Sequence, residues 1–253
     1  MIQKCMNDTN TKAYKVSLAN KCTLTLCIHE EQAADIPSIA QQCSDILQWL
    51  GTPQAFEVYL WYTDNPRWIE KTEWPTRGSV NGGWAIPGSN KVFVYRQEEW
   101  DRVLIHECIH ALNWDWEMPT TPVPCWKFHS EDVLFPHLFE AWTELYAEWL
   151  WCGWHNQSWT KQRELQDTQA IQLYARRKTT KRWIEDTNLF SYYILKACLA
   201  PHIEFLWSYR NGTTEQERLQ VLCGLVTPRL AYFQQQAKHV EPVALSMRMT
   251  VKN

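Results

Sequence analysis

His106, Glu107 and His110 form the pattern His-Glu-x-x-His and are the strongest candidates for chemistry in the chain. In a helix, positions i and i+4 lie on one face about a turn apart, so the two imidazoles could bind one tetrahedral ion. Zinc lowers the pKa of a bound water to roughly 7, and an adjacent carboxylate can take its proton as the water attacks a carbonyl. The pattern therefore predicts a zinc-dependent hydrolase with Glu107 as general base.

The residues around this pattern are mostly apolar: Val103, Leu104, Ile105, Cys108, Ile109 and Leu112. Such a run predicts a buried helix, in which the three polar side chains need partners because unpaired burial is costly. A metal ion would supply these partners. The alternative is a structural pair of histidines satisfied by ordinary hydrogen bonds.

The third ligand must come from elsewhere in the chain. A metzincin would continue HxxGxxH, but Asn113 stands at the glycine position and Trp116 at the position of the third histidine. Three carboxylates recur at helical spacing in the apolar segment 137–151, namely Glu140, Glu144 and Glu148. One can complete a His₂Glu site, and a second can accept the other ring N–H of a ligand histidine. The alternative is a solvated acidic edge on a surface helix.

The two patterns together resemble the gluzincin group of metallopeptidases, in which an HExxH helix is followed by a helix with a Glu-x-x-x-acid motif. EAWTE at 140–144 looks like that motif, and the resemblance implies Glu140 as third zinc ligand and Glu144 as the residue that holds a ligand histidine. The shifted register ELYAE at 144–148 would make Glu144 the ligand, but the Thr-Glu ending favours Glu140. The block 80–151 is also similar to uncharacterised HExxH proteins of large DNA viruses.

The gluzincin resemblance implies a zincin-like α+β fold, with an N-terminal twisted sheet and helices, a mainly helical C-terminal lobe and an active-site cleft between them. It also implies one Zn²⁺ ion, a peptide or protein substrate, and Glu107 passing its proton to the leaving amine. Hydrolysis of esters or other amides stays chemically open. Two rival hypotheses are a catalytically silent zincin-fold protein that binds partners through a Trp-rich cleft, and a structural zinc site closed by a further side chain such as His129.

Two further sets of site residues are expected. The stretch before the HExxH segment resembles the start of the edge strand along which substrates pair in thermolysin-like members: Asn81, Gly82, Gly83 and Trp84. A simple Asn-Gly hairpin turn is the alternative. Metallopeptidases usually offer a Tyr or His to the oxyanion, and our catalytic candidate is Tyr193, with Tyr192 beside it. Other available donors are Tyr146, His129, His137 and His155.

The composition of the 253 residues excludes several function classes. With 45% hydrophobic residues and 16 tryptophans the chain can bury a core, so global disorder is not expected. A net charge of −3 gives no general attraction to nucleic acid or anionic membranes. The run at 175–182 is basic, which predicts either a solvated helix end or a docking patch for an acidic protein tail or nucleic acid.

The sequence also carries an expectation about location. Neither a signal peptide nor a membrane span is visible, and nine cysteines without a CxxC pair fit a reducing compartment, so we expect an intracellular, cytoplasmic protein. The sequence does not indicate an oligomeric state.

The periodicity predicts an α+β protein in two lobes, 1–114 and 115–253, with the HExxH helix in the first and the third ligand in the second. Expected strands lie at 14–28, 56–63, 80–86 and 91–96. Expected helices lie at 32–50 with a C-cap at Gly51, and at 98–114, 137–151, 159–178, 181–199 and 214–237.

Overall fold

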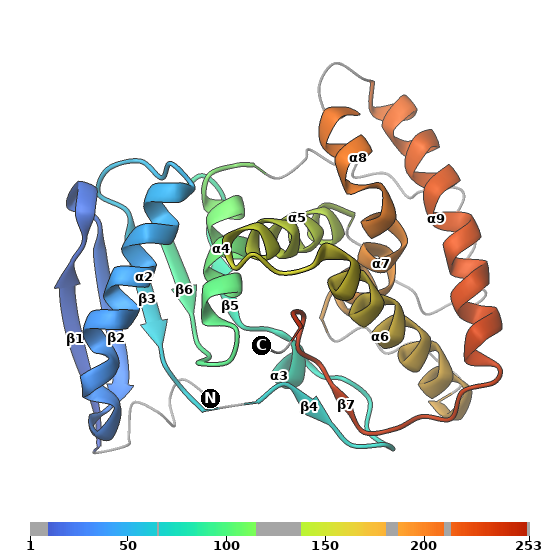
Figure 1. Ribbon diagram of the computed structural model, residues 1–253, viewed down its shortest axis with the longest axis horizontal. Helices are drawn as coiled ribbons and strands as arrows, with labels where there is room; N and C mark the ends of the chain where they lie inside the picture. The colour runs from blue at the N-terminus through green and yellow to red at the C-terminus, as the bar shows by residue number, and fades with distance from the viewer. Residues whose placement is uncertain (1–9, 65, 115–137, 181–186, 210–213, 252–253) are drawn as a thin grey trace. The chain divides into compact units, whose positions relative to one another are not determined.

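The computed structural model describes residues 10–64, 66–114, 138–180, 187–209 and 214–251 (Figure 1). The chain is α+β and divides into two compact units. The first comprises Met1–Pro66 and Gly82–Trp114, and the second comprises Arg67–Asn81 and Asp115–Asn253. The expected two-part division placed 67–81 in the first lobe, whereas this segment belongs to the second unit.

The first unit is built on a mixed five-stranded sheet in the order β1-β2-β3-β6-β5. Its strands are β1 (Thr11–Ser17), β2 (Thr23–His29), β3 (Glu57–Trp61), β5 (Gly83–Ala85) and β6 (Lys91–Val94). β2, β3 and β6 run parallel to one another, while β1 and β5 pair antiparallel at the two edges. The central strands therefore carry the apolar core, and β5 is an edge strand of the sheet among the described residues.

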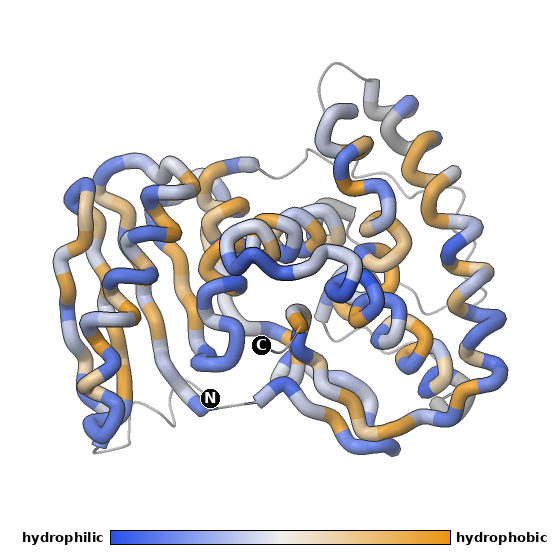
Figure 2. The backbone as a smooth tube through the Cα atoms, viewed as in Figure 1, coloured by the Kyte–Doolittle hydropathy of each residue, from blue (hydrophilic) through white to orange (hydrophobic). Residues whose placement is uncertain are grey.

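One face of this sheet is buried beneath α2 (Ile36–Trp49) and α4 (Trp100–Ala111). Strand residues alternate between buried and half-exposed, as period-2 patterning requires, and Figure 2 shows the matching alternation of hydropathy along the strands. The buried set is Leu24, Leu26, Val58, Leu60, Val92 and Val94. The other face carries half-exposed aromatic and polar side chains.

Two details of this unit follow from local sequence. Helix α2 ends as expected at Gly51, which has φ +64°; Gly51 N–H bonds Gln48 O and Thr52 N–H bonds Leu47 O, which is a Schellman cap. The strand structure expected at 14–28 is confirmed in part, because most of these residues lie in β1 and β2, which form a hairpin. A short 3₁₀ turn, η1 (Ala19–Lys21), separates them, with Asn20 at φ 55°.

The second unit is mainly helical. It contains α3 (Arg77–Val80), α5 (Leu138–Trp154), α6 (Trp159–Thr180), the π-helix η3 (Phe190–Leu195), α7 (Lys196–Leu199), α8 (Ile203–Tyr209) and α9 (Glu215–Ala237). A two-stranded sheet joins β4 (Trp68–Ile69) to β7 (Leu245–Ser246). This pairing explains why 67–81 packs with the C-terminal half. The helix expected at 181–199 is confirmed only in part, because 181–186 lie outside the described residues and 190–195 are a π-helix.

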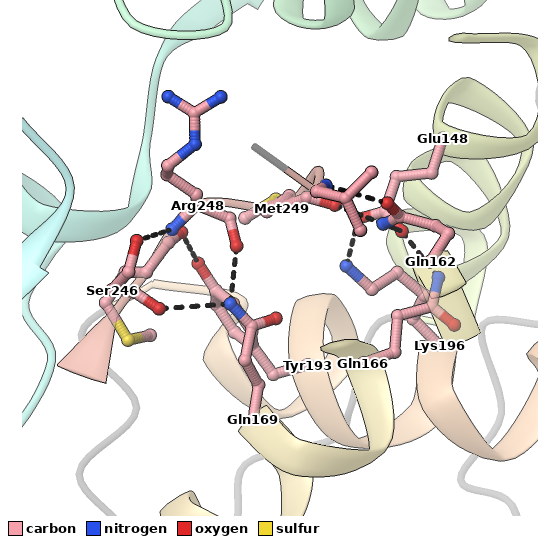
Figure 3. Close-up of polar contacts among 11 residues, drawn as sticks. Glu148, Gln162, Gln166, Gln169, Tyr193, Lys196, Ser246, Arg248 and Met249 are labelled. Atoms are coloured by element: carbon pink, nitrogen blue, oxygen red, sulfur yellow. Dashed lines mark hydrogen bonds and ion pairs between the residues drawn. The ribbon is translucent and has the colours of Figure 1, made fainter. Parts of the chain in front are cut away.

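The polar face of α6 holds the C-terminal segment 243–251 through its main chain (Figure 3). Gln169 Nε2 donates to Ser246 O over 3.1 Å, and Val251 N–H donates to Gln162 Oε1 over 3.0 Å. Gln162 also donates to Met249 O over 2.5 Å. Within the segment, Leu245, Met247 and Met249 are buried, whereas Val243 is exposed.

Arg176, on the same helix, corrects one interpretation of the basic run at 175–182. Its side chain is only 2% exposed, and it donates to the carbonyls of Glu70, Lys71 and Glu73 over 2.7 to 3.0 Å. It also bonds Val243 O. Arg176 is thus a structural clamp, and the expected solvated or docking patch cannot include it.

Glu148 and Lys196 form an ion pair in the interior of this unit, with both side chains fully buried (Figure 3). Gln162 and Gln166 each donate to Glu148 Oε2, over 2.8 and 2.5 Å. Burial raises the pKa of Glu148 to about 7, against the opposing effect of Lys196. This pair is the main polar feature of the packed helices.

Two remaining findings concern the whole described chain. No helix in the described ranges is long and apolar enough to cross a membrane. Six described cysteines are free thiols, namely Cys22, Cys27, Cys43, Cys108, Cys152 and Cys198. Cys223 is disulfide-bonded.

Candidate metal centre

Helix α4 positions the two histidines. All twelve of its residues are buried, so the polar side chains of the HExxH motif lie in an interior with little access to water. The Nε2 atoms of His106 and His110 are 3.1 Å apart, and their rings meet at 74°. Two nitrogens bound to one tetrahedral zinc at about 2.05 Å would be about 3.3 Å apart. The expected one-face arrangement is confirmed, and its spacing suits a shared ion.

Glu107 lies against the edge strand β5. A Cβ atom on Gly83 would sit 2.8 Å from Glu107 Oε1 and 2.6 Å from Phe93 O, closer than real Cβ contacts allow. Glycine is therefore required where this strand passes the carboxylate. Glu107 itself is 5% exposed. The candidate base is buried beside the edge strand of the described sheet.

The four residues of the Asn-Gly-Gly-Trp stretch have different environments. Gly83 and Trp84 belong to β5, and Gly82 O accepts from Tyr95 N–H. Asn81 instead ends α3, and its Oδ1 accepts a 2.6 Å hydrogen bond from Thr187. The alternative of a hairpin turn is wrong, because these residues join a helix to the edge strand.

Glu140 is near the start of α5 and is half-buried. The hydroxyl of Tyr192, from the π-helix η3, donates to Glu140 Oε2 over 3.1 Å. Ligand atoms of His106, His110 and Glu140 all lie within 4.8 Å of one another, so these three residues could hold a metal ion. A π-turn shifts the register of a helix, and here it belongs to the element that brings the Tyr192 hydroxyl to the Glu140 carboxylate.

The other two carboxylates of the α5 stripe are buried. Glu144 is 2% exposed and Glu148 is 0% exposed, so the alternative of a solvated acidic edge is wrong. Glu148 is occupied by Lys196 and two glutamines, which excludes it from the metal cluster. The role of Glu144 as the residue that orients a ligand histidine stays a prediction.

The candidate oxyanion donors differ in their burial and in their hydrogen-bond partners. Tyr193 is fully buried and its hydroxyl donates to Met247 O over 2.7 Å, so it holds the C-terminal segment. Tyr192, which precedes it in the chain, is half-exposed, and its hydroxyl donates to Glu140. Tyr146 is buried in a stack with Trp142 and Trp207. His155 packs on Trp151, whereas His129 and His137 lie outside the described residues.

No protein-family model, curated protein or solved structure matches this chain. The chemistry of the centre is therefore argued from its own residues. The described residues bring together two imidazoles and one carboxylate that could hold a metal ion, with a second carboxylate, Glu107, on the same helix as the histidines.

Proposed function

We propose that this chain is a gluzincin-like zinc metallopeptidase with a zincin-like fold, in which His106, His110 and Glu140 hold one zinc ion. The observation that carries the proposal is the cluster of these three ligand atoms within 4.8 Å. Glu107, one residue along α4, supplies the carboxylate that water activation needs. The edge strand β5 beside it has main-chain groups that an extended peptide could pair with.

The residues fit zinc in type and number. Two imidazole nitrogens and one carboxylate oxygen are a usual donor set for catalytic zinc, and three protein ligands leave a fourth position open. The 3.1 Å separation of the two Nε2 atoms supports a shared ion. When bound there, zinc would lower the pKa of a water molecule to near 7 and polarise a carbonyl.

The chain's own groups then have distinct tasks. Glu107 takes a proton on its carboxylate and returns it to the leaving amine. In the structure Tyr192 donates its one hydroxyl proton to Glu140, and it would turn this proton to a developing oxyanion during the reaction. Tyr193 donates its proton to Met247 O in the interior, so we move this role from Tyr193 to Tyr192. Glu144 is proposed to accept a ring N–H of a ligand histidine.

Metal analysis with a matched histidine control tests the zinc site. We expect purified wild-type protein to carry about one zinc per chain, because three protein ligands bind it. His110→Ala should lose nearly all of it, whereas His239→Ala, which removes an exposed histidine, should keep it. The readout is elemental analysis after dialysis. Equal zinc in the two variants would refute the ligand assignment.

A peptide-library cleavage assay on the zinc-loaded wild type tests the activity itself. We expect chelation to remove cleavage and added zinc to restore it. Full zinc occupancy without cleavage of any library peptide would exclude the peptidase and favour the silent binding protein instead.

Paired tyrosine variants test the new oxyanion assignment. Tyr192→Phe should lower kcat by about 10- to 1,000-fold at unchanged zinc content, because it removes one donor at the reacting carbonyl. Tyr193→Phe should leave kcat nearly unchanged and lower the free energy of unfolding by about 1 kcal/mol, since it removes a buried hydrogen bond to Met247 O. The reverse pattern in kinetics and urea unfolding would restore Tyr193 as the donor.

A further inference from the structure

The first unit contains a pocket of about 460 Å³ that shares no residue with the metal cluster. It is lined by Thr11, Cys27, His29, Glu31, Gln32, Trp61, Tyr62, Thr63 and Asp64. Thr11, Cys27 and Trp61 belong to the sheet face opposite the buried Leu24 and Leu26. The pocket therefore opens at the carboxyl ends of the parallel strands β2 and β3, where ligands of mixed α and β proteins commonly bind.

The charges that line this pocket are of one sign. Glu31 and Asp64 are carboxylates, and no lysine or arginine is among the lining residues. In the described part of the chain neither carboxylate has a lysine or arginine partner, and Glu31 has only His29 at 4.0 Å. The nearby Lys12 is already bonded to Glu30. The pocket thus has uncompensated negative charge that repels anions.

Two carboxylates outside the lining, the exposed Asp35 and the buried Asp101, act on the lining residue Tyr62. Burial raises the pKa of the Tyr62 hydroxyl, and the Asp35 and Asp101 carboxylates raise it further. Cys27 adds no charge to the pocket, because burial raises the pKa of its thiol and so favours the neutral form. A neutral or cationic molecule is the only class that this environment accepts without a charge penalty.

Aromatic rings form the remaining wall. Trp61 stacks on Phe93 at 6.1 Å and on Tyr59 at 6.4 Å, which fixes its ring, and it also lines the pocket with Tyr62. The face of an indole or phenol attracts a cation, and carboxylates beside it complete the charge balance. Rings and carboxylates together are the recognition elements for ammonium and guanidinium groups.

We propose that this pocket is a binding site for a small organic cation carrying an ammonium or guanidinium group. Asp64 and Glu31 pair with its positive charge, and Trp61 and Tyr62 cover its apolar part. The volume is in the range that encloses a molecule of metabolite size. The site requires neither the zinc ion nor hydrolysis, so it stands apart from the proposed peptidase.

Titration calorimetry with agmatine, which carries both cationic groups, tests the proposal. We expect saturable binding at one site, weakened about two- to fivefold by Asp64→Asn or Glu31→Gln, because each removes a solvent-exposed ion pair to the bound cation. Asp45→Asn is the matched control: it removes an equal charge from α2, whose Asp45 bonds Gln41 and does not line the pocket. Agmatine affinity should be unchanged in that variant.

Salt, a neutral sugar and inorganic phosphate complete the experiment. Affinity for agmatine should fall as salt rises, since both carboxylates are exposed to solvent, the Glu31 side chain to 89%. Phosphate should not bind. The proposal would be overturned if the folded wild type showed no saturable agmatine binding, or if Asp64→Asn and Asp45→Asn bound agmatine equally well. It would also be overturned if glucose bound more tightly than agmatine with an affinity that Asp64→Asn left unchanged.

Discussion

Replacing Glu107 by glutamine is expected to abolish peptide hydrolysis while zinc stays bound. The two side chains have the same shape, so the substituted amide should fit the buried space beside Gly83 and leave the two histidines in place. An amide cannot take the proton from water, and general-base catalysis contributes about 100- to 10,000-fold. We therefore expect kcat/KM to fall by roughly 1,000-fold or more, measured on the best library peptide.

Two controls make this result specific. Zinc content should stay near one per chain in Glu107→Gln, which separates loss of the base from loss of the metal. Glu164→Gln makes the same change at an exposed position of α6 and should retain full activity. A Glu107→Gln protein that hydrolyses peptides at the wild-type rate would contradict the mechanism.

The histidine pair was predictable because its geometry is local. Helical spacing alone puts His106 and His110 on one face, and the apolar flanking residues predict the burial that the structure shows. The edge strand at Gly83 could also be predicted from the sequence, since glycine in a strand often marks a place where the backbone approaches another group closely. The choice among three evenly spaced glutamates was harder, because sequence spacing does not show which one meets a partner.

The parts that sequence reasoning missed depend on residues far apart in the chain. Arg176 lies in a basic run, yet its partners are 103 to 106 residues earlier and 67 residues later. Tyr192 and Tyr193 are neighbours, and only the π-helix register decides that the first meets Glu140 and the second meets Met247. The spacing of Gln162, Gln166 and Gln169 on one helix face was a signal for a buried polar seam that we did not use.

Lys196→Met should be among the most destabilising substitutions in the second unit. It leaves Glu148 fully buried without its counter-ion, and breaking such a pair from one side costs about 3–5 kcal/mol. The double variant Glu148→Gln with Lys196→Met removes both charges and keeps an amide oxygen for Gln162 and Gln166. The double variant should recover much of the free energy of unfolding that Lys196→Met loses, as measured by urea unfolding. Lys12→Met, in the exposed pair with Glu30, is the control and should change little.

The decrease in the free energy of unfolding caused by Lys196→Met should also depend on pH, and the protonation of Glu148 decides the direction of this dependence. Burial raises its pKa from 4.5 to about 7, so the folded protein binds more protons than the unfolded chain between these values. Its contribution to stability is therefore complete below about pH 4.5 and is lost as pH rises through about 7. Without Lys196, which lowers this pKa, a protonated Glu148 can stay buried at low pH at little cost. Lys196→Met should hence lower the free energy of unfolding less at about pH 5 than at about pH 8. An equal decrease at both pH values would show that charge burial is not its cause.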